Sequence, residues 1–127
     1  MIIERTFDIE DEVRKALSSY FTIYCRPLPK NFKLPSLLVT MTGGNDNKKI
    51  DGCDIIIDAR AKNEAEALNL LLDATATLKA IAQNQNTNIR YVEINSSGSW
   101  GVDPIRPDLA LASARLRIYT HKVEKEI

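Results

Sequence analysis

The sequence predicts an α+β domain in which an antiparallel or mixed sheet of about four to five strands carries two helices packed on one face. Two observations indicate this fold. Several segments alternate apolar and polar residues, as strands with one buried face do. Two other segments repeat apolar residues every three to four positions, which is typical of amphipathic helices. With 127 residues, 44% of them apolar, the chain is long enough for a single domain with its own core.

The first helix is expected over residues 9–19, where apolar side chains recur along a single stripe. Asp8 precedes this stripe and is a suitable N-cap, because its carboxylate can accept a hydrogen bond from a backbone N–H of the first turn. Glu10, Asp11 and Glu12 lie in that turn, where the helix dipole favours negative charge. The cap, the stripe and the charges therefore agree on where this helix begins.

Three strands are expected between the two helices. Residues 21–26 alternate and are rich in aromatic and β-branched types, and a proline-rich connection then leads to a second strand over residues 36–42. The polar segment 43–49 favours a turn, and alternation resumes over residues 53–61, so these last two strands are expected to form an antiparallel hairpin with a long loop. The residues expected on one face of the returning strand are Cys53, Ile55, Ile57 and Ala59.

The second helix is predicted to begin after Asn63, which forms a capping box with Glu66 in the variant that has asparagine at the cap. Apolar residues then recur at helical spacing over about five turns. The helix is expected to end within residues 83–86, where poor helix formers and two candidate C-cap asparagines occur.

Two further strands complete the predicted sheet. Residues 89–94 form a short strand, and the Ser/Gly-rich segment 96–101 is expected to be a loop that residues 103–108 extend with two prolines. The last strand covers residues 109–122, with alternate residues from Ala110 onward on one face, and it leads into a fraying C-terminus. The order of elements is therefore helix, three strands, helix, two strands.

Composition excludes several classes of protein. The 17 basic and 17 acidic residues give a formal net charge of zero, which argues against tight nucleic-acid binding through a uniform basic field. No signal peptide or membrane-spanning stretch is recognisable, so we expect a soluble protein and no membrane partner. Cys25 and Cys53 lie 28 positions apart without a CxxC motif, which favours two buried, reduced thiols over a zinc site or redox pair.

The sequence offers little material for catalysis. His121 is the only histidine and lies near the C-terminus among charged residues, a poor position for an oriented acid–base group. Asp54 and Asp58 are expected on the outer face of a strand, where solvated carboxylates are the ordinary interpretation and divalent-cation binding is the alternative. The segments 43–44 and 96–99 have residues that could hold a phosphate, but neither leads into a helix. We therefore expect neither an enzyme nor a bound metal or cofactor.

The charges are segregated along the chain. Residues 1–13 hold five acids and one base, whereas residues 14–33 hold five bases and no acid. Such a distribution could direct head-to-tail contact between identical subunits, because a heterologous interface joins two different patches of one molecule. The alternative is that these charges are simply solvated. The candidate contact charges are Glu10, Asp11, Glu12, Arg26, Lys30 and Lys33.

The order of elements resembles that of the small tail-terminator, or tail-completion, proteins of long-tailed bacteriophages. The resemblance includes the N-terminal amphipathic helix and covers most of the chain. The segments that carry it further are Leu-Pro-Ser-Leu-Leu-Val at 34–39, Asp-Ile-Ile-Ile-Asp-Ala-Arg-Ala at 54–61, Asn-Glu-Ala-Glu-Ala-Leu at 63–68, Asp-Pro-Ile-Arg-Pro-Asp at 103–108 and Ala-Arg-Leu-Arg-Ile-Tyr at 114–119.

This resemblance implies a structural protein of the virion, located between tail and neck and present in the host cytoplasm during assembly. Such proteins form rings, typically hexamers, that cap the head-proximal end of the tail tube, stop its growth and contact the neck or connector proteins of the head. They have no cofactor and no catalytic activity. DNA would pass through the ring without tight binding. A neck or head-completion protein is the nearest alternative, and a small-ligand-binding α+β domain is a more distant one.

By position in the fold, two loops would contact the tube or the neck. Trp100 is either a residue that plugs the core or an exposed anchor of the kind that dominates interfaces. The candidate partner-contact residues are Asn45, Asp46, Asn47, Lys48 and Lys49 in the hairpin tip, and Trp100, Asp103 and Arg106 in the later loop.

Overall fold

The structure is a computed structural model that describes residues 1–45, 50–84, 87–103 and 106–127. It is an α+β fold, as predicted. The described elements in chain order are β1 (Ile2–Arg5), α1 (Ile9–Leu17), β2 (Ile23–Cys25), β3 (Ser36–Asn45), β4 (Ile50–Ala61), α2 (Glu64–Gln83), β5 (Ile89–Val102), β6 (Ala110–His121) and β7 (Val123–Glu126).

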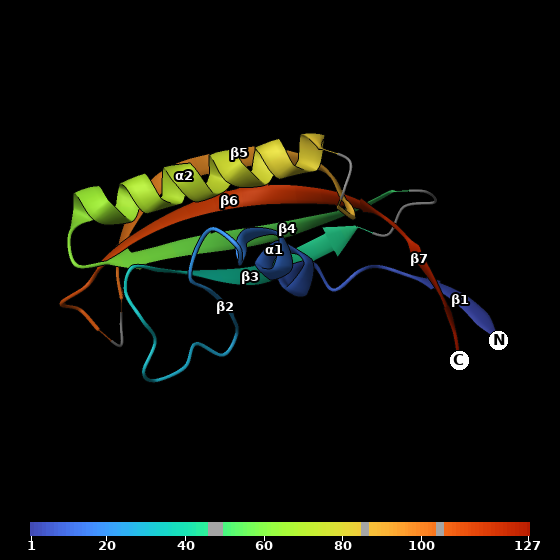
Figure 1. Ribbon diagram of the computed structural model, residues 1–127, viewed down its shortest axis with the longest axis horizontal. Coiled ribbons are helices and arrows are strands. Elements are labelled where there is room, and N and C mark those ends of the chain that lie inside the picture. Colours follow the sequence, from blue (N-terminus) through green and yellow to red (C-terminus); the bar gives the residue numbers. More distant parts are fainter. Residues whose placement is uncertain (46–49, 85–86, 104–105) are drawn as a thin grey trace.

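The main sheet has five strands in the order β2-β3-β4-β6-β5, and β1 and β7 form a separate two-stranded ribbon. Strand β2 runs parallel to β3, whereas the other neighbours in the main sheet are antiparallel. Both helices cover the same face of this sheet, with α2 lying along β5 and β6 and α1 beside β2 and β3 (Figure 1). The mixed five-stranded sheet with two helices on one face confirms the predicted architecture.

The core lies between the helices and the inward-facing residues of the central strands. Ile55 and Ile57 of β4 and Leu116 of β6 are at most 1% exposed, and Ile55 pairs directly with Leu116. The predicted alternation places these residues on one face, because directly opposed residues of an antiparallel pair point to the same side. From α1, Ile9 and Leu17 join the same cluster.

Both helices begin at the predicted caps. Asp8 Oδ1 accepts the backbone N–H of Asp11 at 3.2 Å, and Asn63 Oδ1 accepts that of Glu66 at 2.9 Å. Helix α1 ends at Leu17, two residues before the predicted end, and α2 ends with Asn84 as its C-cap, within the predicted range. Within the described part of the chain, neither helix is sufficiently long and apolar to cross a membrane.

Strand β5 corrects the prediction for the segment 96–101. This segment is not a loop: it continues the strand to Val102, and Trp100 pairs with Ala112 of β6. The Ser/Gly-rich residues are accommodated by shifts in register between Ile94 and Ser99, and Gly98 adopts a φ of +81°, which L side chains rarely adopt. Pairing with the long strand β6 therefore overrides the local preference for a turn.

The two chain ends also differ from the prediction, because the C-terminus does not fray. Strand β7 pairs antiparallel with β1, and the backbone N–H of Ile127 donates to the carbonyl of Met1 at 2.9 Å. The resulting ribbon extends beyond one end of the main sheet (Figure 1). His121 is the last residue of β6 and is exposed.

Candidate functional site

The acids of α1 that were expected to contact a neighbouring subunit are already engaged within the chain. Arg26 Nη2 lies 2.6 Å from Glu10 Oε2, and the backbone N–H of Met41 donates to the same oxygen at 3.1 Å. Burial alone would raise the pKa of Glu10, but these hydrogen bonds and the charge of Arg26 outweigh it, so the pKa lies below its ordinary value. The structure therefore pairs one predicted contact acid with one predicted contact base.

The other two acids of that group also have partners. Asp11 binds Arg14 at 2.7 Å and Lys15 at 3.0 Å, and hydrogen bonds from both lower the pKa of its carboxyl group. Glu12 Oε2 accepts a hydrogen bond from the Asn88 side chain at 3.3 Å. As these contacts show, the acidic first turn of α1 is partnered within the subunit by side chains close to it.

Lys30 and Lys33 are the members of the predicted set that remain free. Both are exposed, and neither forms an ion pair with any residue that the structure describes. Lys30 borders a groove of about 320 Å³ between the proline-rich connection and the segment that follows β5. The other residues that line this groove are Leu28, Pro29, Phe32, Asp103 and Arg106. The groove thus combines an apolar lining with the bases Lys30 and Arg106 and with Asp103, whose carboxylate is paired with Arg60.

Asp103 is not available as a surface contact, which corrects the expectation that it orders against a partner. Its residue is 1% exposed, and its Oδ2 lies 2.7 Å from Nε of Arg60, which is 8% exposed. Nη1 of Arg60 is buried and has no hydrogen-bond partner. Pairing with Asp103 offsets part of the cost of burying the charge of Arg60, and it holds the segment after β5 against the sheet. No local pattern in the sequence indicates this contact, because the two residues are 43 positions apart.

The remaining candidates of the later loop lie at the surface. Arg106 forms a two-pronged pair with Asp108, with distances of 3.0 Å from Nε and 2.9 Å from Nη2 to the two carboxylate oxygens. Trp100 is 49% exposed, so it is not a core residue. It shares the edge strand β5 with Tyr91 and Ile94, which are also exposed. Of the hairpin-tip candidates, Asn45 is the last residue of β3, whereas Asp46, Asn47, Lys48 and Lys49 lie outside the described residues.

Asp54 and Asp58 of β4 lie on the face of the sheet opposite the helices, as predicted, because the alternate residues Ile55 and Ile57 point into the core. Asp54 binds Arg117 of β6 at 2.9 Å, and Asp58 accepts a hydrogen bond from the Ser113 hydroxyl. In the described part of the chain, no group of three or more potential ligands is placed to hold a metal ion. These aspartates therefore act as cross-strand partners within the sheet.

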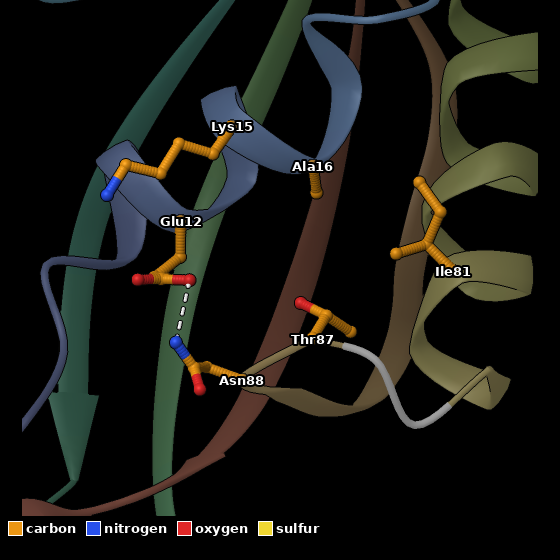
Figure 2. Close-up of a pocket in the computed structure, with 6 residues that line it drawn as sticks. All are labelled: Glu12, Lys15, Ala16, Ile81, Thr87 and Asn88. Carbon is orange, nitrogen blue, oxygen red and sulfur yellow. Dashed lines mark hydrogen bonds between the residues drawn. The ribbon is translucent and has the colours of Figure 1, made fainter.

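A pocket lies between α1 and the end of α2, and its lining includes two titratable residues, Glu12 and Lys15. Figure 2 shows the Glu12 carboxylate directed at Asn88, while the Lys15 ammonium points away from both Asn88 and Thr87. Lys15 is bound to Asp11 instead. Glu12 and Lys15 therefore do not form an acid–base pair across this pocket.

The cysteines have different surroundings. Cys53 is buried in the core, whereas Cys25 is only half-buried, and the two do not form a disulfide. Burial is the main cause that raises the pKa of Cys25, and the nearby Glu10 adds to it. A raised pKa keeps this thiol protonated and poorly nucleophilic.

Taken together, these features define an α+β domain whose unusual surfaces are an exposed edge strand, a projecting ribbon and a partly apolar groove bordered by Lys30. No protein-family model matches the sequence, and a search of characterised proteins finds no significant match.

Proposed function

We propose that the protein is a structural virion protein of long-tailed bacteriophages. In this proposal, a ring of its subunits caps the head-proximal end of the tail tube, ends tube polymerisation and joins the tail to the head. The ring requires no cofactor, and its partners are copies of itself, the tail tube protein and the neck or connector protein.

The observation that carries the proposal is the order and placement of the elements. The succession from α1 through the β3–β4 hairpin and α2 to the long strand β6 is the order on which the resemblance to tail terminators rests. The strand order places β5 at an edge of the main sheet, where Tyr91, Ile94 and Trp100 are exposed. Exposed aromatic residues on an accessible strand edge support a role in assembly, since such residues often anchor interfaces.

The binding partner tests this proposal against its nearest alternative. Purified protein is incubated separately with preformed tail tubes and with connector-bearing heads, and bound complexes are imaged by electron microscopy. Tail-terminator function predicts density at one end of each tube. Binding only to heads would reject the terminator role and favour a neck protein. Binding to neither partner would reject both assembly roles and favour the small-ligand-binding alternative.

A further inference from the structure

The ribbon of β1 and β7 has one strongly acidic face. Glu4 lies directly opposite Glu124, and Ile2 lies directly opposite Glu126. These four residues point to the same side, because they are directly paired or two positions apart on a strand. All four are exposed, and the three glutamates form no ion pair with any described residue.

This arrangement is unfavourable in an isolated subunit. Like charges directly opposite each other destabilise an antiparallel pair, and a short two-stranded ribbon has little stability of its own. The other face of the ribbon carries Ile3 and Val123, which are half-buried, so the acidic face is directed outward. Ile2 adds an apolar side chain that is 68% exposed on the same face, opposite Glu126 and beside Glu4. A partner surface that combines basic and apolar residues would reduce both the repulsion between the glutamates and the exposure of Ile2.

The groove beside Lys30 has those properties. Leu28, Pro29 and Phe32 provide apolar lining, Lys30 borders the groove, and Lys33 lies three residues further along the same connection. Both lysines lack a carboxylate partner among the described residues. Lys30 therefore lies next to an apolar surface with Lys33 nearby, as the glutamates of the ribbon lie next to Ile2.

The ribbon and the groove cannot meet within one subunit. The ribbon lies at one end of the longest axis of the molecule, and the proline-rich connection that forms the groove lies toward the other end (Figure 1). Two complementary patches at opposite ends produce a head-to-tail contact, and repeated contacts of this kind close into a ring when the rotation per subunit allows.

We propose that the β1–β7 ribbon of one subunit docks in the groove of the next, with Ile2 on Leu28 and Phe32 and with the ribbon glutamates facing Lys30 and Lys33. This contact deepens the proposed function, on which it rests, by assigning the surfaces that join neighbouring subunits of the ring.

Charge reversal tests the contact. Sedimentation of the full-length protein, from micromolar to millimolar concentration, measures the dissociation constant between subunits for wild type, Glu124→Lys, Lys30→Glu and the double variant. Each single reversal is expected to raise this constant at least about tenfold, because it places like charges across the contact. The double reversal is expected to return it to within about threefold of wild type, because the pair is restored with opposite polarity.

Two matched variants control for general effects of charge. Lys125→Glu alters the opposite face of the same ribbon, and Lys79→Glu alters an exposed residue of α2. Both are expected to leave the dissociation constant within about threefold of wild type. Unfolding midpoints of all variants verify that the changed residues, which are exposed, do not alter the fold.

Disulfide trapping provides a readout that does not depend on charge. The variant Ile2→Cys/Phe32→Cys should form covalent oligomers on oxidation, whereas Ile2→Cys/Leu72→Cys, with its second cysteine on α2, should not. The docking proposal is overturned if the chain stays monomeric at every concentration, if the single reversals assemble like wild type, or if the double reversal fails to restore assembly.

Tube capping, measured in parallel, separates this contact from the proposed function. If the charge-reversal variants assemble like wild type and still cap tubes, the docking contact is rejected and the proposed function is retained. If charge reversal weakens assembly but the wild-type protein does not cap tubes, the proposed function is rejected and the docking contact is retained.

Discussion

At the scale of single residues, the pair formed by Arg60 and Asp103 connects distant parts of the chain. Asp103 follows the end of β5, and Arg60 lies near the end of β4, 43 positions earlier. Both side chains are at most 10% exposed. Removing one charge would leave the other buried without its partner, which is more costly than losing an exposed pair.

We expect Asp103→Asn to lower the free energy of unfolding by about 3–5 kcal/mol. Asp108→Asn is the matched control, since it also removes a carboxylate from an arginine but at an exposed pair, and should cost no more than about 1 kcal/mol. Urea unfolding at neutral pH measures both. Equal losses of stability in the two variants would show that burial does not make the Arg60–Asp103 pair more important for stability than an exposed pair.

Glu10 makes stability depend on pH. Its pKa in the folded protein lies below the ordinary value of 4.5, so its contribution is fully present above that value and is lost as pH falls through the folded pKa. Glu10→Gln should therefore reduce the loss of stability between about pH 5 and pH 3. Urea unfolding across this range tests the effect, with the exposed Asp73→Asn as control. An unchanged pH profile in Glu10→Gln would contradict this role.

At the scale of elements, the sequence predicted what local chemistry determines. Caps such as Asp8 and Asn63 act within one turn, so their side chains mark helix starts correctly. Lys30 is also exposed, as expected for a charged residue in a proline-rich connection. The partner of Asp103 was missed because an ion pair across 43 positions leaves no periodic pattern.

Strand pairing between distant segments explains the other differences. The ribbon joins the first and last residues of the chain, and no local pattern indicates that β1 and β7 meet. Residues 96–101 have the composition of a turn, but a neighbouring strand supplies hydrogen-bond partners that composition does not reveal. The predicted fold class is correct, whereas the surfaces available to a partner could be identified only from the structure.

The cap of α2 provides a test at this scale. Asn63→Ala removes the acceptor for the Glu66 backbone N–H and should destabilise the protein by about 0.5–2 kcal/mol. Asn69→Ala, at an exposed position inside the same helix, should instead be neutral or slightly stabilising, because alanine is the better helix former. Thermal unfolding distinguishes the two. A loss at Asn69 as large as that at Asn63 would contradict the capping role.

At the scale of the whole molecule, the β1–β7 ribbon and the groove beside Lys30, which the proposed contact would join, lie toward opposite ends. Subunit association should therefore weaken as salt rises, because ions screen exposed charges over about 8 Å at physiological ionic strength. Sedimentation at several salt concentrations measures this dependence, and the double variant Glu124→Lys/Lys30→Glu should retain it. A ring mass independent of salt would indicate that apolar contacts alone hold the subunits together.

The length of tail tubes most directly tests the central claim that a ring of this protein caps the tail tube and ends its growth. Tube protein is polymerised with and without the purified protein, and tube lengths and end densities are measured by electron microscopy. The account predicts that added protein stops growth, narrows the length distribution and appears as a ring at one end of each tube. Tubes that continue to grow to uncontrolled lengths with bare ends, at protein concentrations where rings are present, would contradict it.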